Sequence, residues 1–301
     1  MFNLVGKMLY HYTDETGLKG IFLKSNPDIQ NEIHIRFSTA SRFSDKTEGK
    51  HAIELFHEVC RAFFADKKSN KELYEATQKI SLQEEAFVMH AGDINSAPTD
   101  ILPLKAPIVI DFGRVKTFIA CFSENEDNQA LWHLDGKQNI FAIEFFDPNH
   151  FQHWLPDGNS NNTPFYVHFE KVIYDDISKK QRIEEDLHES YQLYRNNRKK
   201  FRNSLKQSIS EYQYIFKNEQ YHPENETRAI IKVKRLSDLR RFGISPFVDK
   251  KGKYFHFPMN EIFVASIRIR SDVADADVAA LAAIVKECVP NTTVVYKGRS
   301  I

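Results

Sequence analysis

The sequence has few of the residues that mark several common protein classes. Only 11 of its 301 residues are glycine, and it has no glycine-rich phosphate-binding loop of the Walker or dinucleotide type. Its three cysteines, Cys60, Cys121 and Cys288, are odd in number and far apart. That spacing argues against a disulfide framework and against a zinc site built on cysteine pairs. We therefore expect no Rossmann-type site, and a protein of a reducing compartment.

Long apolar runs and an excess of charge are also missing. No segment approaches the roughly 20 apolar residues of a membrane helix, and residues 1–7 lack the basic and apolar regions of a signal peptide. The 41 basic and 41 acidic residues cancel, so a general affinity for polyanions is not expected, although a local basic patch remains open. We expect a cytoplasmic protein that does not contact a membrane.

Strand and helix patterns are mixed along the chain, which predicts an α+β fold. No internal repeat or low-complexity tract divides it, so we expect a single domain over residues 1–301. Strands are expected at 8–13, 33–38, 107–110, 117–122, 140–146, 165–174, 227–233, 253–257, 262–269 and 292–296, and helices at 17–23, 47–64, 71–87, 178 to about 216, and 273–288.

His11 is the first candidate functional residue. The first strand places His11 and Thr13 on one face, and Asp14 then looks like the N-cap of a short helix. A lone histidine in a strand is more often a hydrogen-bonded core residue, because this side chain has many non-catalytic roles. A capped helix directly after the strand, however, places strand-end side chains at the lip of a pocket.

An acidic segment far along the chain is the second candidate. A period of two places Glu224, Glu226 and Arg228 on one face as the chain enters a strand. The arginine would offset the repulsion between the two carboxylates, and a carboxylate held in this way can stabilise positive charge on a sugar ring. The alternative interpretation is a solvated strand edge.

A basic stretch of the long helix is the third candidate. One interpretation is a strip for a nucleic-acid strand, with cations on phosphates and aromatic rings on bases. The other, slightly favoured, is a solvated face balanced by the acids at 184–189. No set of His, Cys, Asp and Glu residues has metal-ligand spacing, so no metal is expected. The residues of the stretch are Arg195, Arg198, Lys199, Lys200, Arg202 and Lys206, with Tyr194 and Phe201 between them.

Four short blocks resemble a large, poorly characterised bacterial domain family whose pattern runs the length of the chain. This sequence departs from the pattern in the second block, where Asn-Asp-Pro is altered to Ser44-Asp45-Lys46, and in the use of Leu for Met and Tyr for Trp. The matching residues are Tyr10-His11-Tyr12-Thr13 with Leu18 and Ile21; Phe37-Ser38 with Phe43, Asp45 and Glu48; Cys121-Phe122-Ser123 with Asp127-Asn128 and Leu131-Trp132; and Lys217, Tyr221, Glu224, Glu226 and Arg228.

The opening block and the late Glu-x-Glu also resemble ADP-ribosyltransferases, especially bacterial toxins that modify nucleic acid. This resemblance implies a split β-sheet core, here with helical insertions at about 47–90 and 178–216, and NAD as a substrate. It implies that His11 hydrogen-bonds the adenosine ribose, that the backbone of Tyr12 holds the nicotinamide amide, and that Thr13 supports the turn. Ser38 would order the site and Phe43 would stack on the nicotinamide ring.

The same resemblance assigns the chemistry to the acids. Glu226 would bind the nicotinamide-ribose hydroxyl and stabilise the transition state, while Glu224 would orient or deprotonate the acceptor. It thus implies a mono-ADP-ribosyltransferase acting on RNA or DNA, a toxin or anti-phage effector that needs an antitoxin partner. Two alternatives stay open: a non-catalytic nucleotide- or nucleic-acid-binding module, and a nuclease or phosphotransferase that uses His11.

Overall fold

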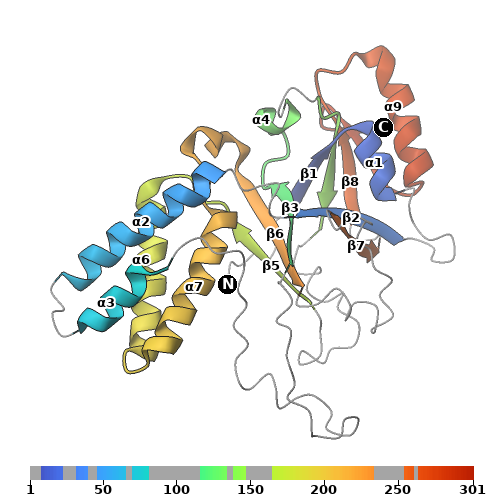
Figure 1. The fold of residues 1–301 in the computed structure, drawn as a ribbon. Coiled ribbons are helices and arrows are strands. Elements are labelled where there is room, and N and C mark those ends of the chain that lie inside the picture. Colours follow the sequence, from blue (N-terminus) through green and yellow to red (C-terminus); the bar gives the residue numbers. More distant parts are fainter. Residues whose placement is uncertain are drawn as a thin grey trace, which may run out of the picture.

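A computed structural model describes residues 8–22, 32–39, 46–65, 70–80, 116–133, 138–146, 165–233, 254–260 and 264–301 (Figure 1). One large β-sheet and several separate helices give the expected α+β architecture. None of the helices within these ranges is long and apolar enough to cross a membrane. The strand expected at 107–110, residues 81–87 and Phe43 lie outside them, and the helix expected at 71–87 ends at Gln78.

The described elements confirm most of the expected strands and helices to within three residues at each end. The strands are β1 (Leu9–Thr13), β2 (Glu32–Thr39), β3 (Lys116–Ser123), β4 (Phe141–Phe145), β5 (Phe165–Lys171), β6 (Glu226–Val233), β7 (Tyr254–Asn260), β8 (Val264–Ile269), β9 (Thr293–Tyr296) and β10 (Arg299–Ser300). The helices are α1 (Glu15–Phe22), α2 (Lys46–Phe64), α3 (Lys71–Gln78), α4 (Gln129–Trp132), α6 (Asp176–Tyr194), α7 (Arg198–Ile215) and α9 (Asp275–Cys288), with a 3₁₀ helix η5 (Glu219–Glu224).

The sheet branches at β3. Its path runs β10-β9-β8-β4-β1-β3-β2-β7, and β5 is attached through β6. Because β6 pairs with the whole length of β3, strands β1 and β2 share the opposite edge of β3. The described pairs place β1 at Ser123 and β2 at Phe118 and Ile119. The sheet therefore separates between β1 and β2 beside the carboxyl half of β3.

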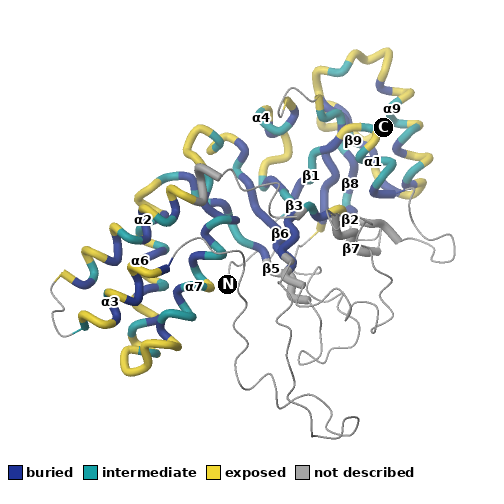
Figure 2. The backbone as a smooth tube through the Cα atoms, viewed as in Figure 1, coloured by how far each residue is buried: buried dark blue, intermediate teal, exposed yellow. Residues whose placement is uncertain are grey.

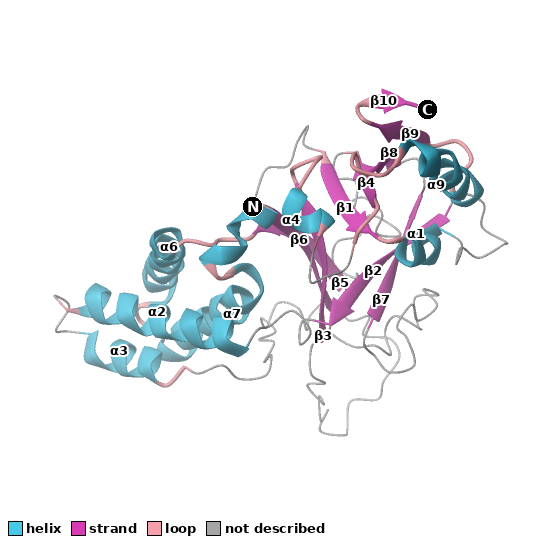
Figure 3. Cartoon of the chain, turned by 90° about the horizontal axis from the view of Figure 1, so that it is seen from above, coloured by secondary structure: helices cyan, strands magenta, loops and turns pink. Residues whose placement is uncertain are grey.

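The two faces of β3 belong to two hydrophobic cores. Phe118, Ala120 and Phe122 lie in a core that α1 and α9 cover, whereas Ile119 packs with Ile230 of β6 against a bundle of α2, α3, α6 and α7. Figure 3 shows this bundle beside the sheet, and Figure 2 shows its buried inner side and exposed outer side. Because successive side chains of β3 point to opposite faces, this strand contributes to both cores and connects them.

The end of β1 turns directly into α1. Asp14 caps the helix as expected, since its Oδ1 accepts a hydrogen bond of 2.6 Å from the Gly17 N–H. A Cβ atom on Gly17 would lie 2.0 Å from Oγ1 of Thr13. Glycine at this position therefore lets the helix approach the strand end closely.

The expectation of one long helix from 178 to about 216 is wrong. The chain breaks at residues 195–197 and forms the hairpin α6–α7, in which Ser190 faces Ser204 and Asp186 accepts a hydrogen bond from Tyr212. The break follows from Asn197, whose side chain accepts from the Lys200 N–H and so caps a second helix. Periodicity alone could not reveal it, because both helices bury their apolar faces in the same core.

Candidate acid site

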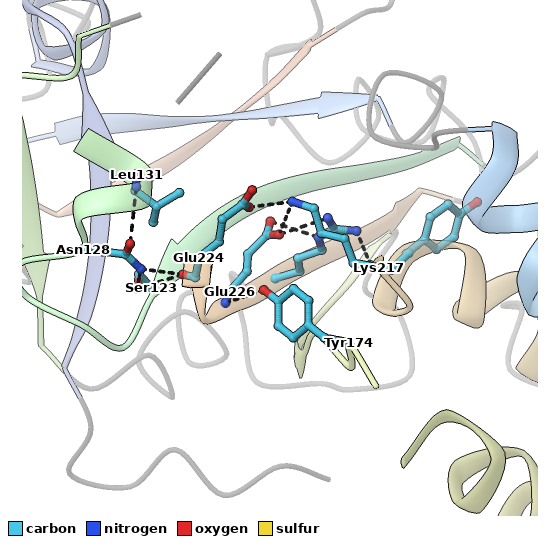
Figure 4. Close-up of polar contacts among 9 residues, drawn as sticks. Ser123, Asn128, Leu131, Tyr174, Lys217, Glu224 and Glu226 are labelled. Carbon is cyan, nitrogen blue, oxygen red and sulfur yellow. Dashed lines mark hydrogen bonds and ion pairs between the residues drawn. The ribbon is translucent and has the colours of Figure 1, made fainter. Parts of the chain in front are cut away.

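Lys217 brings the two carboxylates of the acidic segment together (Figure 4). Its Nζ lies 2.5 Å from Oε2 of Glu224 and 3.3 Å from Oε2 of Glu226. Glu224 ends η5 and Glu226 begins β6, so strand alternation does not align them. Asn225 between them adopts a left-handed conformation, with φ at 44°, which turns the chain between the two acids.

Glu226 is the more firmly held acid. Arg228 donates to both of its oxygens, from Nε and from Nη2, each at 3.0 Å, and donates a third bond from Nη1 to the carbonyl of Tyr214 in α7. Both side chains of this ion pair are almost fully buried. Burial by itself raises the pKa of Glu226, but the charges of Arg228 and Lys217 outweigh it and lower the pKa to about 2. Glu226 is therefore ionised across the physiological range.

The pKa of Glu224 is shifted in the opposite direction. Burial raises its pKa, and the hydrogen bond and charge of Lys217 offset only part of this effect. Within the described part of the chain its Oε1 has no hydrogen-bond partner, whereas Oε2 faces Lys217. The two acids thus differ in protonation preference and in free hydrogen-bonding capacity, as acid and base pairs in active sites do.

Tyr174, which sequence analysis did not single out, and Cys121 of the Cys-Phe-Ser block surround Glu226. Its backbone N–H donates to the hydroxyl of Tyr174 at 2.9 Å, and the thiol of Cys121 hydrogen-bonds its carboxylate. Burial, followed by the charge of Glu226, raises the pKa of Cys121 well above its ordinary value. Cys121 therefore stays a thiol and is not an activated nucleophile.

Asn128 connects the acids to α4. Its Nδ2 donates to the carbonyl of Glu224 at 2.7 Å and to Oγ of Ser123 at 3.1 Å, while its Oδ1 accepts from the N–H groups of Ala130 and Leu131. Asn128 is 2% exposed, and the two bonds that it donates to Glu224 and Ser123 are buried. The amide of Asn128 therefore helps to fix the position of the acidic segment.

Tyr12 of β1 binds the loop between β3 and α4, which contains Asn125 and Asn128. Its hydroxyl donates to the carbonyl of Asn125 at 2.6 Å and accepts from the Asn128 N–H at 2.9 Å. The ring meets the buried Trp132 edge-on at 4.6 Å, and the indole N–H of Trp132 donates to Asp127 at 2.7 Å. The side chains of the Asp-Asn and Leu-Trp block thus form a structural connection between β1 and the acids, and Trp132 is a core residue.

His11 occupies the point where β1 leaves β3. Its Nδ1 donates to the carbonyl of Cys121 at 3.0 Å, and its ring packs on Phe122. Burial, together with the charge of Arg36, lowers the pKa of His11, and the bond to Cys121 offsets this only in part. The imidazole is therefore neutral near pH 7, and because Nδ1 donates, Nε2 carries the lone pair.

The structure does not bring His11 and the acids to one face of the sheet. Tyr10 pairs with Ser123, and Ser123 pairs with Glu226, so these three side chains share a face. His11 follows Tyr10 in β1 and must project from the opposite face, because successive side chains of a strand alternate. The resemblance required His11 and Glu226 to contact one NAD molecule, and the register separates them.

The other residues expected around NAD are spread out. Thr13 is buried at the end of β1, on the face of His11. Ser38 pairs with Ile119, four residues along β3 from Ser123, which is the serine opposite Glu226. Ser123 also donates from Oγ to the carbonyl of Glu224 at 3.2 Å. The sequence signal that could have identified Ser123 as a residue of the site is its place in the Cys-Phe-Ser block.

The basic residues lie in the turn between α6 and α7 and in the first half of α7, whereas the acids follow the other end of α7. Arg195, Arg198 and Lys199 are exposed, and Arg202 is partly buried. Phe201 is fully buried in the bundle core, so its ring is not available to stack on a base, as the strip interpretation would need. Tyr194 is partly exposed and packs against the same core.

Comparison with known proteins identifies no relative of this chain. No family model, no curated protein and no solved structure matches the chain. In the described ranges, no group of three or more His, Cys, Asp or Glu side chains is placed to hold a metal ion. The fold and the site together define an α+β protein with a buried acid pair beside a branched sheet.

Proposed function

We propose that the chain is a mono-ADP-ribosyltransferase that cleaves NAD and transfers ADP-ribose to a nucleic acid. The reaction class comes from the resemblance of the opening block and the Glu-x-Glu segment to that class of enzyme. The observation that carries the proposal is the acid pair: Lys217 contacts both Glu224 and Glu226, whose pKa values are displaced in opposite directions.

The chemistry needs little more than these carboxylates. The bond between the nicotinamide nitrogen and C1′ of the ribose breaks, its electron pair leaves with neutral nicotinamide, and positive charge develops on the ribose. The ionised Glu226 supplies fixed negative charge close to that position, the main electrostatic requirement of such a step. An oxygen or nitrogen of the acceptor bonds to C1′, and its proton passes to Glu224, whose raised pKa suits a base.

The proposed fold is the split sheet of that class, with α2–α3 and α6–α7 as the helical insertions. The branch at β3 supports this assignment, because β1 and β2 diverge from the same edge. Since His11 faces away from Glu226, the proposal places the reaction at the acids and gives His11 the role of holding β1 to β3 through Cys121. An effector of this kind requires an antitoxin in the cell that makes it.

A second function, a non-catalytic nucleotide- or nucleic-acid-binding module, is favoured by a different observation. Both oxygens of Glu226 are already engaged by Arg228. The charges of Lys217, Arg228, Glu224 and Glu226 also sum to zero when all four are ionised. A buried ion pair that is closed in this way can be purely structural and need not contribute to turnover.

The test is incubation of the purified protein with NAD labelled on its adenosine half and with separate RNA, DNA and protein pools. We expect label on a nucleic-acid pool, loss of transfer by at least about 100-fold in Glu224→Gln, and wild-type transfer in Glu219→Gln. Glu219 is the matched control because it is an exposed acid in the same 3₁₀ helix. Neither label transfer nor nicotinamide release by the folded wild type would favour the binding module.

Glu226 needs its own pair of variants. Glu226→Gln leaves Arg228 buried without its partner, which costs about 3–5 kcal/mol, so loss of transfer alone would not separate chemistry from folding. Glu226→Gln combined with Arg228→Met removes both charges and leaves no buried charge unpaired. Wild-type nicotinamide release by this double variant, folded by circular dichroism, would overturn the role of Glu226.

A further inference from the structure

The first turn of α7 carries positive charge where a helix disfavours it. Arg198, Lys199 and Lys200 occupy this turn, and no acid accompanies them. The amino end of a helix already has partial positive charge from its unpaired N–H groups, so cations there are destabilising. All three residues are exposed, next to the turn between α6 and α7.

The same sign of charge continues along one side of α7. Arg198, Arg202 and Lys206 are spaced four residues apart, which places them on neighbouring turns, where like charges repel. The pKa of Lys206 is lowered by burial and by the charge of Arg202. Nε of Arg202 is buried and has no hydrogen-bond partner.

Acids do not neutralise these cations. Within the described chain, neither Arg195 nor any cation of α7 takes part in an ion pair, although Lys179 and Lys180 of α6 pair with Asp176 and Glu58. Of the acids at 184–189, Asp186 instead contacts Tyr212 and Arg182. We call the unpaired set the α7 stripe: Arg195, Arg198, Lys199, Lys200, Arg202 and Lys206.

We propose that the α7 stripe binds the phosphate backbone of a nucleic acid. Arg198, Arg202 and Lys206 are about one turn, or roughly 6 Å, apart and form a line about 12 Å long. A linear polyanion such as a nucleic acid can bind along this line, because its phosphates release their counterions when cations neutralise them. The apolar side of α7, with Phe201, Leu205 and Ile209, is buried in the bundle. It leaves no apolar face on this helix to enter a lipid surface.

The length of α7 also gives the minimum length of a nucleic acid that could reach from the α7 stripe to the acids. The helix runs from the stripe to the acid site, where the carbonyl of Tyr214 accepts from Arg228. From Arg198 to Ile215 the rise is about 26 Å, which corresponds to about eight base pairs at roughly 3.4 Å each. This length argument rests on the proposed function, because it takes the acids as the place of reaction; the docking itself does not.

The experiment measures binding of fluorescent RNA and DNA hairpins with stems of 4, 8 and 12 base pairs, by anisotropy, with no NAD present. We expect Arg198→Glu/Lys199→Glu to weaken binding by about tenfold at low salt and to flatten the dependence of log K on log salt by about two units. Lys297→Glu/Arg299→Glu is the matched control, because it makes the same charge change at the C-terminal hairpin.

The outcomes separate this proposal from the enzymatic one. Equal affinity and equal salt dependence of the two double variants would overturn the stripe as a docking site. Polyglutamate that competes with the 12-base-pair hairpin at equal charge concentration would assign the stripe to an acidic protein instead. Glu224→Gln should bind the hairpins like wild type, so a missing transferase activity leaves the binding result intact. With an active enzyme, transfer should rise steeply between stems of 4 and 8 base pairs.

Discussion

Asn128 and His11 each join strands or loops that the chain brings together from distant positions. The amide of Asn128 donates to two acceptors and accepts from two N–H groups, so it acts as a helix cap and as a cross-connection at once. His11 donates to a carbonyl of β3 at the point where β1 departs. Neither role is visible from residue type, because each depends on which backbone groups are left without strand partners.

Replacement of Asn128 should therefore cost more than loss of an ordinary cap. Asn128→Ala removes four hydrogen bonds, two of them buried, and we expect the free energy of unfolding to fall by about 3 kcal/mol. Asn197→Ala is the control, since Asn197 is an exposed cap, and it should cost about 1 kcal/mol. Urea unfolding followed by circular dichroism measures both. Equal costs would show that the bonds to Glu224 and Ser123 contribute nothing.

The neutral His11 predicts a pH dependence of stability. The folded protein lowers the pKa of His11 from the ordinary 6.5, so the unfolded chain binds a proton more readily. This contribution to stability is complete above pH 6.5 and is lost as the pH falls below it, by at most about 1.4 kcal/mol per pH unit. We expect the melting temperature to fall less between pH 7.5 and 5.5 in His11→Asn, which keeps a donor for Cys121. The exposed His133→Asn should behave like wild type.

At the scale of elements, α7 shows a conflict between local rules and sequence. Cations crowd its amino end and repeat every four residues, yet the helix is well packed along its other side. Such conflicts are expected where selection acts on binding and not on stability.

Replacing cations of the α7 stripe should therefore increase the stability of the protein. Arg198→Glu/Lys199→Glu should raise the free energy of unfolding by about 1 kcal/mol, because acids favour the first turn. Gln207→Glu adds an acid in the exposed middle of the same helix and should change stability by less than about 0.5 kcal/mol. Thermal unfolding at low salt compares the two. A stabilised variant that no longer binds hairpins would show that these cations are kept for binding.

For the whole molecule, the sequence predicted elements better than their assembly. Alternation and helical periodicity located β1, β3, β6 and α9, because each buries one face. The branch at β3 and the break in the α6–α7 hairpin were not predictable from periodicity, since pairing edges and a shared core are set by distant segments. For the site, spacing placed Glu224 and Glu226 near Arg228, but it could not reveal that Tyr214, Tyr174 and Asn128 complete their surroundings.

The helical bundle has a consequence for how the protein is made. The apolar faces of α2 and α3 are covered by α6 and α7, which begin 112 residues after α2 ends, from Phe64 to Asp176. At about 5–20 residues per second, a ribosome takes roughly 6–22 seconds to cover that distance. During that interval the nascent chain presents Phe56, Val59 and Phe64 without their partners. We therefore expect these apolar side chains to be most prone to aggregation while the chain is being made, before α6 and α7 have been synthesised.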